Sequence, residues 1–135
     1  MKAYISRRYQ LSASHRLHSE SYSPERNLQV YGKCNHPHGH GHNYVVEVTV
    51  GGQVDPATGM VCDLAHLDRL VQREIVERFD HMNLNLDHVF AKAVPTTENL
   101  CLEIYRILQT RLTHGSLEKV RVEETSKNFF ECAGN

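Results

Sequence analysis

The sequence predicts an α+β fold in which a four-stranded antiparallel sheet carries two helices on one face. Three observations lead to this prediction. Four segments alternate apolar and polar residues, which is the period of a strand with one buried face, and two longer segments repeat apolar residues at helical spacing. The order along the chain is strand, strand, helix, helix, strand, strand, which is typical of a sheet whose helices lie together on one face.

The first predicted strand covers residues 3–17, and the polar stretch at residues 18–27 is expected to be a surface loop. Successive side chains of a strand point to opposite faces, so residues two apart share a face. The inward face of this strand holds one histidine among apolar residues: Leu11, Ala13, His15 and Leu17.

The second predicted strand covers residues 43–50 and continues the parity of two histidines just before it. The period of two puts one set of side chains on a single face: His40, His42, Tyr44, Val46, Val48 and Val50. The two histidines therefore extend an apolar face and point inward. Glycine and proline within residues 51–59 predict a turn region after the strand.

Two helices follow this turn region. Asp63 is a suitable N-cap for a helix that runs to about Phe79 with an apolar stripe on one side. The second helix is expected to start near residues 95–98 and to run to about Leu112. Two short strands then complete the sheet, at residues 120–124 and 129–132.

Length and composition predict one domain that spans residues 1–135. Apolar residues make up 40% of the chain, which is enough for a core, although a metal or a subunit interface would add useful stability at this size. Lys plus Arg number 15 and Asp plus Glu number 16, so the charge favours no nucleic-acid partner. Without a membrane-length apolar run or a signal peptide, we expect a cytoplasmic protein with no membrane partner.

Histidine is unusually frequent, with 10 in the chain. His40 and His42 project in the same direction, which suits two ligands of one metal ion, and His15 is the best third ligand because it also lies on an inward strand face. Three histidines without a cysteine are typical of a catalytic zinc site with one open position. The alternative is a flexible histidine-rich loop that binds metals loosely, and His36 and His38, which share the parity of the pair, complicate the count.

Three other groups have side chains suited to catalysis. Cys34 becomes reactive if a metal or cation stabilises its thiolate, and otherwise is a buried structural cysteine. Asp80 and His81 form a possible acid–base pair, although this dipeptide is common by chance. Glu124 shares a face with two core valines, so its carboxylate should meet a ligand or a cation unless the strand end bends toward solvent.

The remaining cysteines, Cys62, Cys101 and Cys132, are interpreted as small buried apolar residues. The four cysteines are widely and unevenly spaced, which argues against a zinc finger or a redox motif. In a cytoplasmic protein they are expected to be reduced.

Six collinear segments together resemble the 6-pyruvoyl tetrahydropterin synthase family, which includes the related 6-carboxytetrahydropterin synthases, over nearly the full length. Each segment alone is a weak signal, whereas all six in order are highly specific. The segments are residues 11–17, 31–44, 55–61, 80–81, 96–99 and 124–125.

The resemblance implies the tunnelling fold, in which subunits assemble into a barrel, as trimers that stack into a hexamer with each site between subunits. It implies one zinc ion per subunit, held by His15, His40 and His42, in agreement with the strand parity. His36 and His38 replace residues that are usually uncharged and polar in the family, and no role is transferred to them.

The resemblance also implies catalytic roles. Cys34 corresponds to the family's general base, and Asp80 and His81 correspond to its proton-relay partners. Glu124 corresponds to the residue that grips the amino-pyrimidine ring of the pterin.

The pterin pocket should also be lined by Thr96 and Thr97. Glu123 stands at a position that is often aromatic or apolar in the family, which leaves two neighbouring carboxylates to consider. Strand parity favours Glu124 as the inward one.

The implied reaction converts 7,8-dihydroneopterin triphosphate to 6-pyruvoyl tetrahydropterin with elimination of triphosphate, as in tetrahydrobiopterin synthesis. Arg16, Arg26 and Lys33 are candidate cations for the triphosphate, or solvated surface charges. The alternative is a 6-carboxytetrahydropterin synthase of queuosine precursor synthesis, where three residues typically separate the cysteine from the histidine pair. Five residues separate Cys34 from His40 here, which favours the pyruvoyl product.

A third hypothesis is a zinc- or pterin-binding protein without catalytic activity. It is disfavoured because every candidate for the chemistry is present: Cys34, Asp80, His81 and Glu124.

Overall fold

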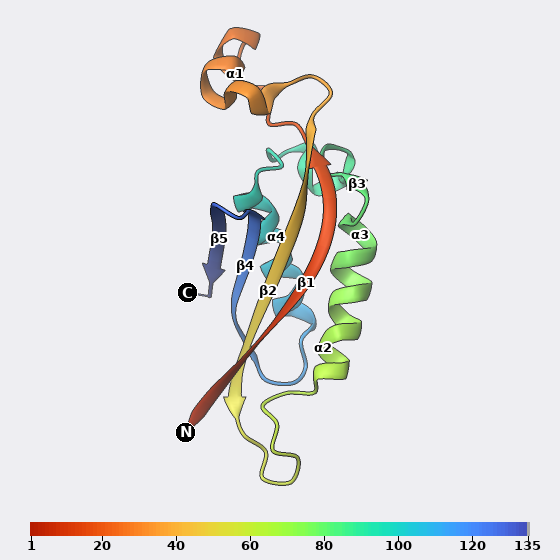
Figure 1. Ribbon diagram of the computed structural model, residues 1–135, viewed down its shortest axis with the longest axis vertical. Helices are drawn as coiled ribbons and strands as arrows, with labels where there is room; N and C mark the ends of the chain where they lie inside the picture. The colour runs from red at the N-terminus through yellow and green to blue at the C-terminus, as the bar shows by residue number, and fades with distance from the viewer. Residues whose placement is uncertain (135) are drawn as a thin grey trace.

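One sheet of five strands, in the order β3-β1-β2-β4-β5, organises the computed structural model, which describes residues 1–134 (Figure 1). All neighbouring strands are antiparallel except β3, which pairs in parallel with β1. The strands are β1 (Lys2–His15), β2 (His40–Gln53), β3 (Met82–Asn83), β4 (Ser116–Thr125) and β5 (Asn128–Ala133). The α+β class is therefore confirmed, but the predicted count of four strands is wrong because the two-residue β3 is too short to show a period.

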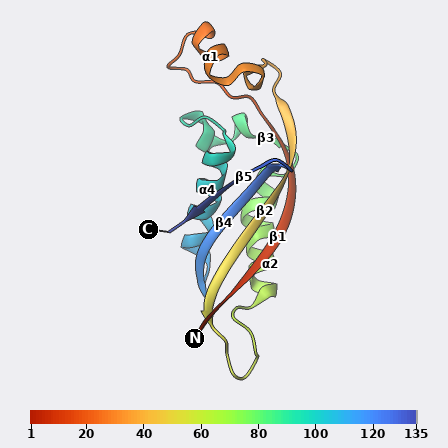
Figure 2. The same cartoon turned by 60° about the vertical axis from the view of Figure 1, so that its left-hand side comes forward.

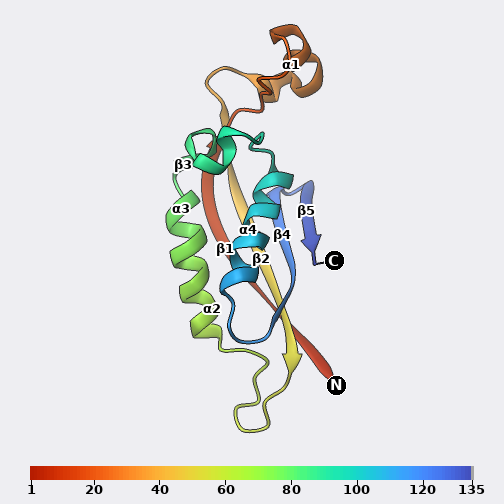
Figure 3. The ribbon, with the colours of Figure 1, turned by 180° about the vertical axis from the view of Figure 1, so that it is seen from behind.

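Two helical segments cover one face of the sheet (Figure 3). The first runs without a break through α2 (Leu64–Val71), a π-helical turn (Gln72–Val76) and α3 (Glu77–Phe79). The second is α4 (Thr97–Arg111). The predicted ends of both helices are close to the observed ones, because each begins at a side-chain cap, from Asp63 for α2 and from Thr96 for α4.

The core lies between the helices and the inward face of the sheet. Figure 2 shows the twist of the strands that form this face. The period-two prediction is confirmed, since β1 buries alternate residues from Leu11 to His15 and β2 buries alternate residues from Tyr44 to Val48. Two short 3-10 turns, Leu84–Leu86 and His88–Ala91, connect β3 toward α4.

The junction between β1 and β2 differs from the prediction at both ends. The first strand ends at His15 rather than at residue 17, and the second begins at His40 rather than at residue 43. The backbone ladder extends as far as the pair His15 and His40, which lie directly opposite each other. Both histidines are therefore held by the sheet itself and do not belong to a flexible loop.

The surface loop predicted at residues 18–27 is wrong in its second half, where α1 (Pro24–Tyr31) begins. The Ser23 hydroxyl accepts a hydrogen bond from the Arg26 N–H, and proline occupies the first helical position, which is a favourable helix start. A 3-10 turn, Gly32–Asn35, follows directly. These helices lie beyond the end of the sheet rather than against its face (Figure 1).

Candidate metal centre and its surroundings

Four side chains gather at one end of the inward sheet face: His15 from β1, His40 and His42 from β2, and Glu124 from β4. One ligand atom from each lies within 4.8 Å of the others. Three neighbouring strands supply these residues, so the ladder fixes their spacing. Within residues 1–134 this is the one group of three or more histidine, cysteine or carboxylate side chains with metal-binding proximity.

The ring orientation of His15 is set by a backbone carbonyl. Its Nδ1 lies 2.7 Å from the carbonyl oxygen of Pro95. A carbonyl oxygen only accepts hydrogen bonds, so Nδ1 carries the proton and Nε2 of the neutral ring presents a lone pair. That lone pair faces Nε2 of His40 at 3.0 Å, which is the arrangement of metal-ligating histidines that donate their other nitrogen to a carbonyl.

His42 has a buried nitrogen that no hydrogen bond satisfies within the described residues. Its Nε2 lies 2.9 Å from Oε1 of Glu124, but this contact lacks the geometry of a hydrogen bond. An unsatisfied buried polar atom costs free energy, and a cation placed among the three Nε2 atoms would remove that cost. The side chains present therefore fit a metal ion.

The environment favours neutral imidazoles, which are the form that binds metals. Burial is the main cause that lowers the pKa of His15, and it outweighs the opposing hydrogen bond to Pro95. Burial, followed by the proximity of His42, also lowers the pKa of His40.

Glu124 is held from its other side by α4. The Thr97 hydroxyl donates a hydrogen bond of 2.7 Å to Oε2 of Glu124. Thr96, by contrast, uses its hydroxyl to cap α4 by accepting from the Asn99 N–H at 3.2 Å. Glu123 points to the opposite sheet face, where it lies 3.8 Å from Arg121, so parity identified the inward carboxylate correctly.

The two extra histidines lie outside this cluster. His36 and His38 are exposed, and their ring centroids are 5.6 Å apart. Gly39, with a φ of 73°, turns the chain between them and the strand. This turn separates the exposed pair from His40. His36 and His38 therefore do not belong to the cluster, although they share the sequence parity of His40 and His42.

Asp80 and His81 form a contact but lie away from the four clustered side chains. Asp80 Oδ2 is 3.0 Å from Nδ1 of His81, while its Oδ1 accepts a hydrogen bond of 2.8 Å from the Ser12 N–H. The Ser12 N–H, together with His81, holds the pKa of Asp80 below its ordinary value. The His81 side chain is 84% exposed and has a φ of 60°.

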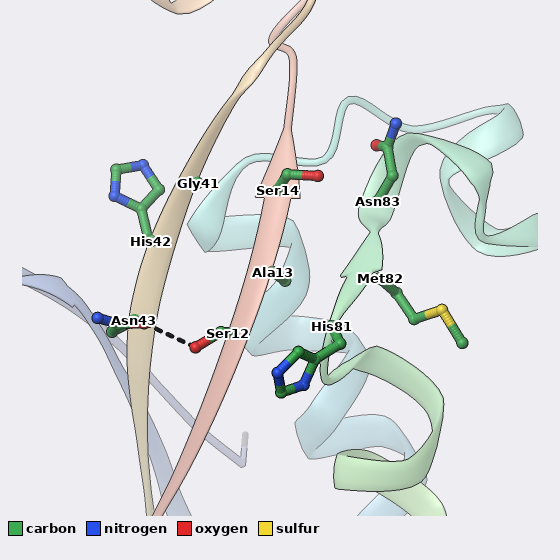
Figure 4. Close-up of a pocket in the computed structure, with 9 residues that line it drawn as sticks. All are labelled: Ser12, Ala13, Ser14, Gly41, His42, Asn43, His81, Met82 and Asn83. Atoms are coloured by element: carbon green, nitrogen blue, oxygen red, sulfur yellow. Dashed lines mark hydrogen bonds between the residues drawn. The ribbon is translucent and has the colours of Figure 1, made fainter.

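A surface pocket of about 540 Å³ separates His81 from His42, and both residues line it. In Figure 4 their rings extend from opposite sides of the β1–β2 pair, and Ser12 and Asn43 line the pocket on these strands. The Ser12 hydroxyl donates a 2.6 Å hydrogen bond to the Asn43 side chain across the pair. Within one chain, His81 therefore does not face the metal cluster.

Cys34 is half-buried in the 3-10 turn after α1. Its carbonyl accepts a hydrogen bond of 2.9 Å from the Leu17 N–H, which ties this turn to the end of β1. Its thiol is outside the four-residue cluster described above. The predicted catalytic residues thus occupy three separate places in one subunit.

A second pocket, of about 740 Å³, adjoins His40 and is also lined by Arg16 and Lys33. The Arg16 Nε donates to the Asn35 carbonyl at 3.0 Å, and no carboxylate residue of the described chain lines this pocket. Arg26 is elsewhere, with its guanidinium 5.6 Å from the ring centroid of Tyr22.

Two features of the site were missed by sequence reasoning. The Pro95 carbonyl lies 80 residues from His15, and no side-chain pattern reveals a backbone acceptor. The α1 helix was recognisable from Ser23, Pro24 and Glu25, which form a typical helix start.

None of the helices within residues 1–134 is long and apolar enough to cross a membrane.

Residues 4–135 match the family model described as 6-pyruvoyl tetrahydropterin synthase. A human protein named 6-pyruvoyl tetrahydrobiopterin synthase is 52% identical over 134 residues, which cover 98% of this chain and 92% of the human protein.

Further relatives agree with this match. A Drosophila melanogaster protein with the same name is 44% identical over 134 residues, covering 98% of this chain and 80% of that protein. The solved structure of Caenorhabditis elegans 6-pyruvoyl tetrahydropterin synthase superimposes with a TM-score of 0.96 at 40% identity, covering 100% of this chain and 97% of that chain.

Proposed function

Because the chain belongs to the 6-pyruvoyl tetrahydropterin synthase family, we propose that it converts 7,8-dihydroneopterin triphosphate to 6-pyruvoyl tetrahydropterin with elimination of triphosphate. The observation that carries this proposal is the convergence of three histidine Nε2 atoms beside a carboxylate that a threonine holds in place. We place the enzyme in the cytoplasm, since its four cysteines are free thiols, as in a reducing compartment.

His15, His40 and His42 are the residues proposed to hold one zinc ion. Three imidazoles without a thiolate suit zinc in a catalytic rather than a structural site. When bound, zinc supplies Lewis acidity that makes the carbons beside the substrate's side-chain hydroxyls easier to deprotonate.

Glu124 is proposed to grip the amino-pyrimidine ring of the pterin. Its carboxylate is an acceptor pair suited to adjacent N–H groups of such a ring, and the Thr97 hydroxyl fixes its rotation. Because Glu124 stands 2.9 Å from His42, a ring held there places its side chain next to the metal ligands. Thr96, the N-cap residue of α4, is proposed to line the pterin pocket beside Thr97.

Cys34 is proposed as the general base, with His81, oriented by Asp80, as the proton relay. These groups do not meet at the metal cluster within one subunit, so the proposal includes sites completed between subunits of a hexamer built from two stacked trimers. The free edge of β1, which β3 covers only at Ala13 and Ser14, supports such assembly.

The triphosphate is proposed to lie in the pocket beside His40, against Arg16 and Lys33. Substitution of either cation by alanine should raise the KM for the triphosphate substrate while the binding of unphosphorylated neopterin stays unchanged. Equal losses for both ligands would show that the pocket does not bind the phosphates. Arg26→Ala is the matched control.

Product analysis tests the proposal against 6-carboxytetrahydropterin synthesis. The zinc-loaded protein is incubated with 7,8-dihydroneopterin triphosphate, and the pterins are identified by mass spectrometry. We expect 6-pyruvoyl tetrahydropterin together with triphosphate. Accumulation of 6-carboxytetrahydropterin would support the alternative, and binding without any conversion would leave a non-catalytic pterin-binding protein.

A further inference from the structure

Two cysteines that the proposed reaction does not use face each other across the interior. Cys101 lies in α4 and Cys132 lies in β5, and their sulfur atoms are 3.6 Å apart. Cys132 pairs with Val120 in the β4–β5 ladder, and the Cys101 thiol contacts the Val120 carbonyl oxygen. Cys101 therefore packs directly against the hairpin formed by β4 and β5. Within residues 1–134 the contact between Cys101 and Cys132 is the one hydrogen bond between two cysteine thiols.

The contacts of the two thiols hold them in place. Cys101 Sγ lies 3.4 Å from the Val120 carbonyl oxygen, and Cys132 Sγ lies 3.5 Å from the carbonyl oxygen of Cys101. A disulfide needs sulfur atoms at about 2.05 Å, so the two sulfur atoms must approach each other before a bond can form. Cys132 belongs to β5, the last strand of the sheet, and its side chain approaches α4.

Access to reagents differs between the two residues. Cys101 is only 1% exposed, whereas Cys132 is half-buried and has a partial route to solvent. A small reagent is therefore expected to reach Cys132 first. Burial raises the pKa of both thiols, so reaction should be slow at neutral pH and faster in mild alkali.

We propose that Cys101 and Cys132 are a modification site that forms an intramolecular disulfide with a low-molecular-weight disulfide such as oxidised glutathione. The Cys132 thiol loses its proton and attacks one sulfur of the reagent, which breaks the reagent's S–S bond and releases one small thiol. Cys101, after losing its proton, attacks the Cys132 sulfur of the mixed disulfide and releases the second small thiol. Two protein thiols are oxidised, and one reagent disulfide is reduced to two thiols.

The new bond would join α4 to the β4–β5 hairpin. These are the elements that carry Thr97 and Glu124, which already touch through a 2.7 Å hydrogen bond. The disulfide closes the chain segment between Cys101 and Cys132, which lowers the entropy of the unfolded state. The disulfide would therefore stabilise the packing of α4 against the β4–β5 hairpin, and reduction would reverse this effect.

Oxidised glutathione at pH 8.5, followed by peptide mapping under non-reducing conditions, tests the proposal. We expect a peptide pair that joins Cys101 to Cys132 and weighs two hydrogen atoms less than its separate halves. The thermal midpoint should rise by about 5 °C and return after dithiothreitol. The Cys62→Ser variant should behave in the same way as the wild type.

The Cys101→Ser variant should instead retain glutathione on Cys132, because the resolving thiol is absent. Cys132→Ser and Cys132→Ala should both give no cross-link, and either one suffices if the other fails to fold. Stable glutathione on Cys132 in the wild type, with Cys101 still a free thiol, would overturn the proposal. Unmodified Cys101 and Cys132 after prolonged exposure would also overturn it.

Discussion

At the scale of single residues, the placement of one proton orients a histidine of the proposed metal centre. The carbonyl of Pro95 fixes the proton of His15 on Nδ1, which leaves Nε2 free to face His40. On the other side, Thr97 fixes Glu124 beside His42. The orientation of the proposed ligands is thus set by the protein itself, which is the usual role of outer hydrogen bonds at metal sites.

Cys34 provides the sharpest test at this scale. Cys34→Ala should lower turnover about 100-fold or more, the size expected for a lost acid–base group, while zinc content stays at the wild-type level. Steady-state kinetics and metal analysis on the same preparation measure both. Cys62→Ala is the control, since Cys62 is buried away from the metal ligands. Near-normal turnover of Cys34→Ala with full zinc would assign the base to another group.

At the scale of elements, the β1–β2 ladder brings His15 opposite His40. The turn that precedes β2 depends on Gly39, whose φ is 73°. A Cβ added at Gly39 would lie 2.8 Å from the carbonyl oxygen of His15, so only glycine fits at this position between the two histidines.

Gly39→Ala should therefore destabilise the protein and weaken zinc binding together. Gly59 is the matched control, because it has the same φ of 73° but no heavy atom of residues 1–134 within 4 Å of an added Cβ. Gly59→Ala should cost about 1 kcal/mol from the backbone conformation alone. Gly39→Ala should cost about 2 kcal/mol more, because of the clash, with roughly tenfold weaker zinc affinity. Equal effects of the two variants on zinc affinity would contradict this role of the turn.

Arg78 joins three elements away from the metal centre. It lies 2.7 Å from Asp87 and 3.3 Å from Glu103 of α4, which also pairs with Arg106. The hydrogen bonds from Arg78 hold the pKa of Asp87 below its ordinary value. Burial alone would raise the pKa of Glu103, but Arg106 and Arg78 together lower it.

Arg78→Met should therefore lose about 2 kcal/mol of unfolding free energy at pH 7, since the partly buried Asp87 loses its guanidinium partner. A depressed carboxyl pKa stabilises the fold above the ordinary value and ceases to do so as pH falls through the folded pKa. The difference from the wild type should accordingly shrink below about pH 4 in urea titrations. Arg73→Met, which removes an exposed pair with Glu74, should cost less than about 0.5 kcal/mol. A pH-independent loss in Arg78→Met would indicate lost packing instead.

Sequence periodicity predicted the longer helices and strands, because each has one buried face that repeats along its length. The strand faces that carry His15, His40 and His42 followed from the period of two, and the helix starts followed from Asp63 and Thr96. Two-residue β3 has no period to detect. The spatial separation of Cys34 and Asp80 from the metal ligands depends on tertiary packing, which local patterns do not encode.

At the scale of the whole molecule, both edges of the sheet leave backbone groups unpaired within the described chain. One edge is formed by β1, which β3 covers over two residues, and the other by β5. Exposed strand edges favour association with further copies. The proposed hexamer would pair these edges and bring Cys34 and His81 of different subunits to each metal centre.

Light scattering at micromolar concentration measures this assembly. We expect a mass of about six subunits, and we expect kinetics of mixed Cys34→Ala and His81→Ala subunits to recover part of the activity that each variant lacks alone. A monomer with full turnover would show that one chain completes its own site.

A titration of turnover against bound zinc shows whether catalysis depends on a zinc ion at His15, His40 and His42. Metal-free protein should show no turnover. As zinc is added, turnover should rise in proportion to bound zinc until each subunit holds one ion. His42→Ala should neither bind zinc nor recover activity, while His38→Ala, altered at an exposed histidine, should follow the wild-type line. Full turnover without metal, or loss of zinc in His38→Ala with retention in His42→Ala, would show that these three histidines do not hold a catalytic zinc ion.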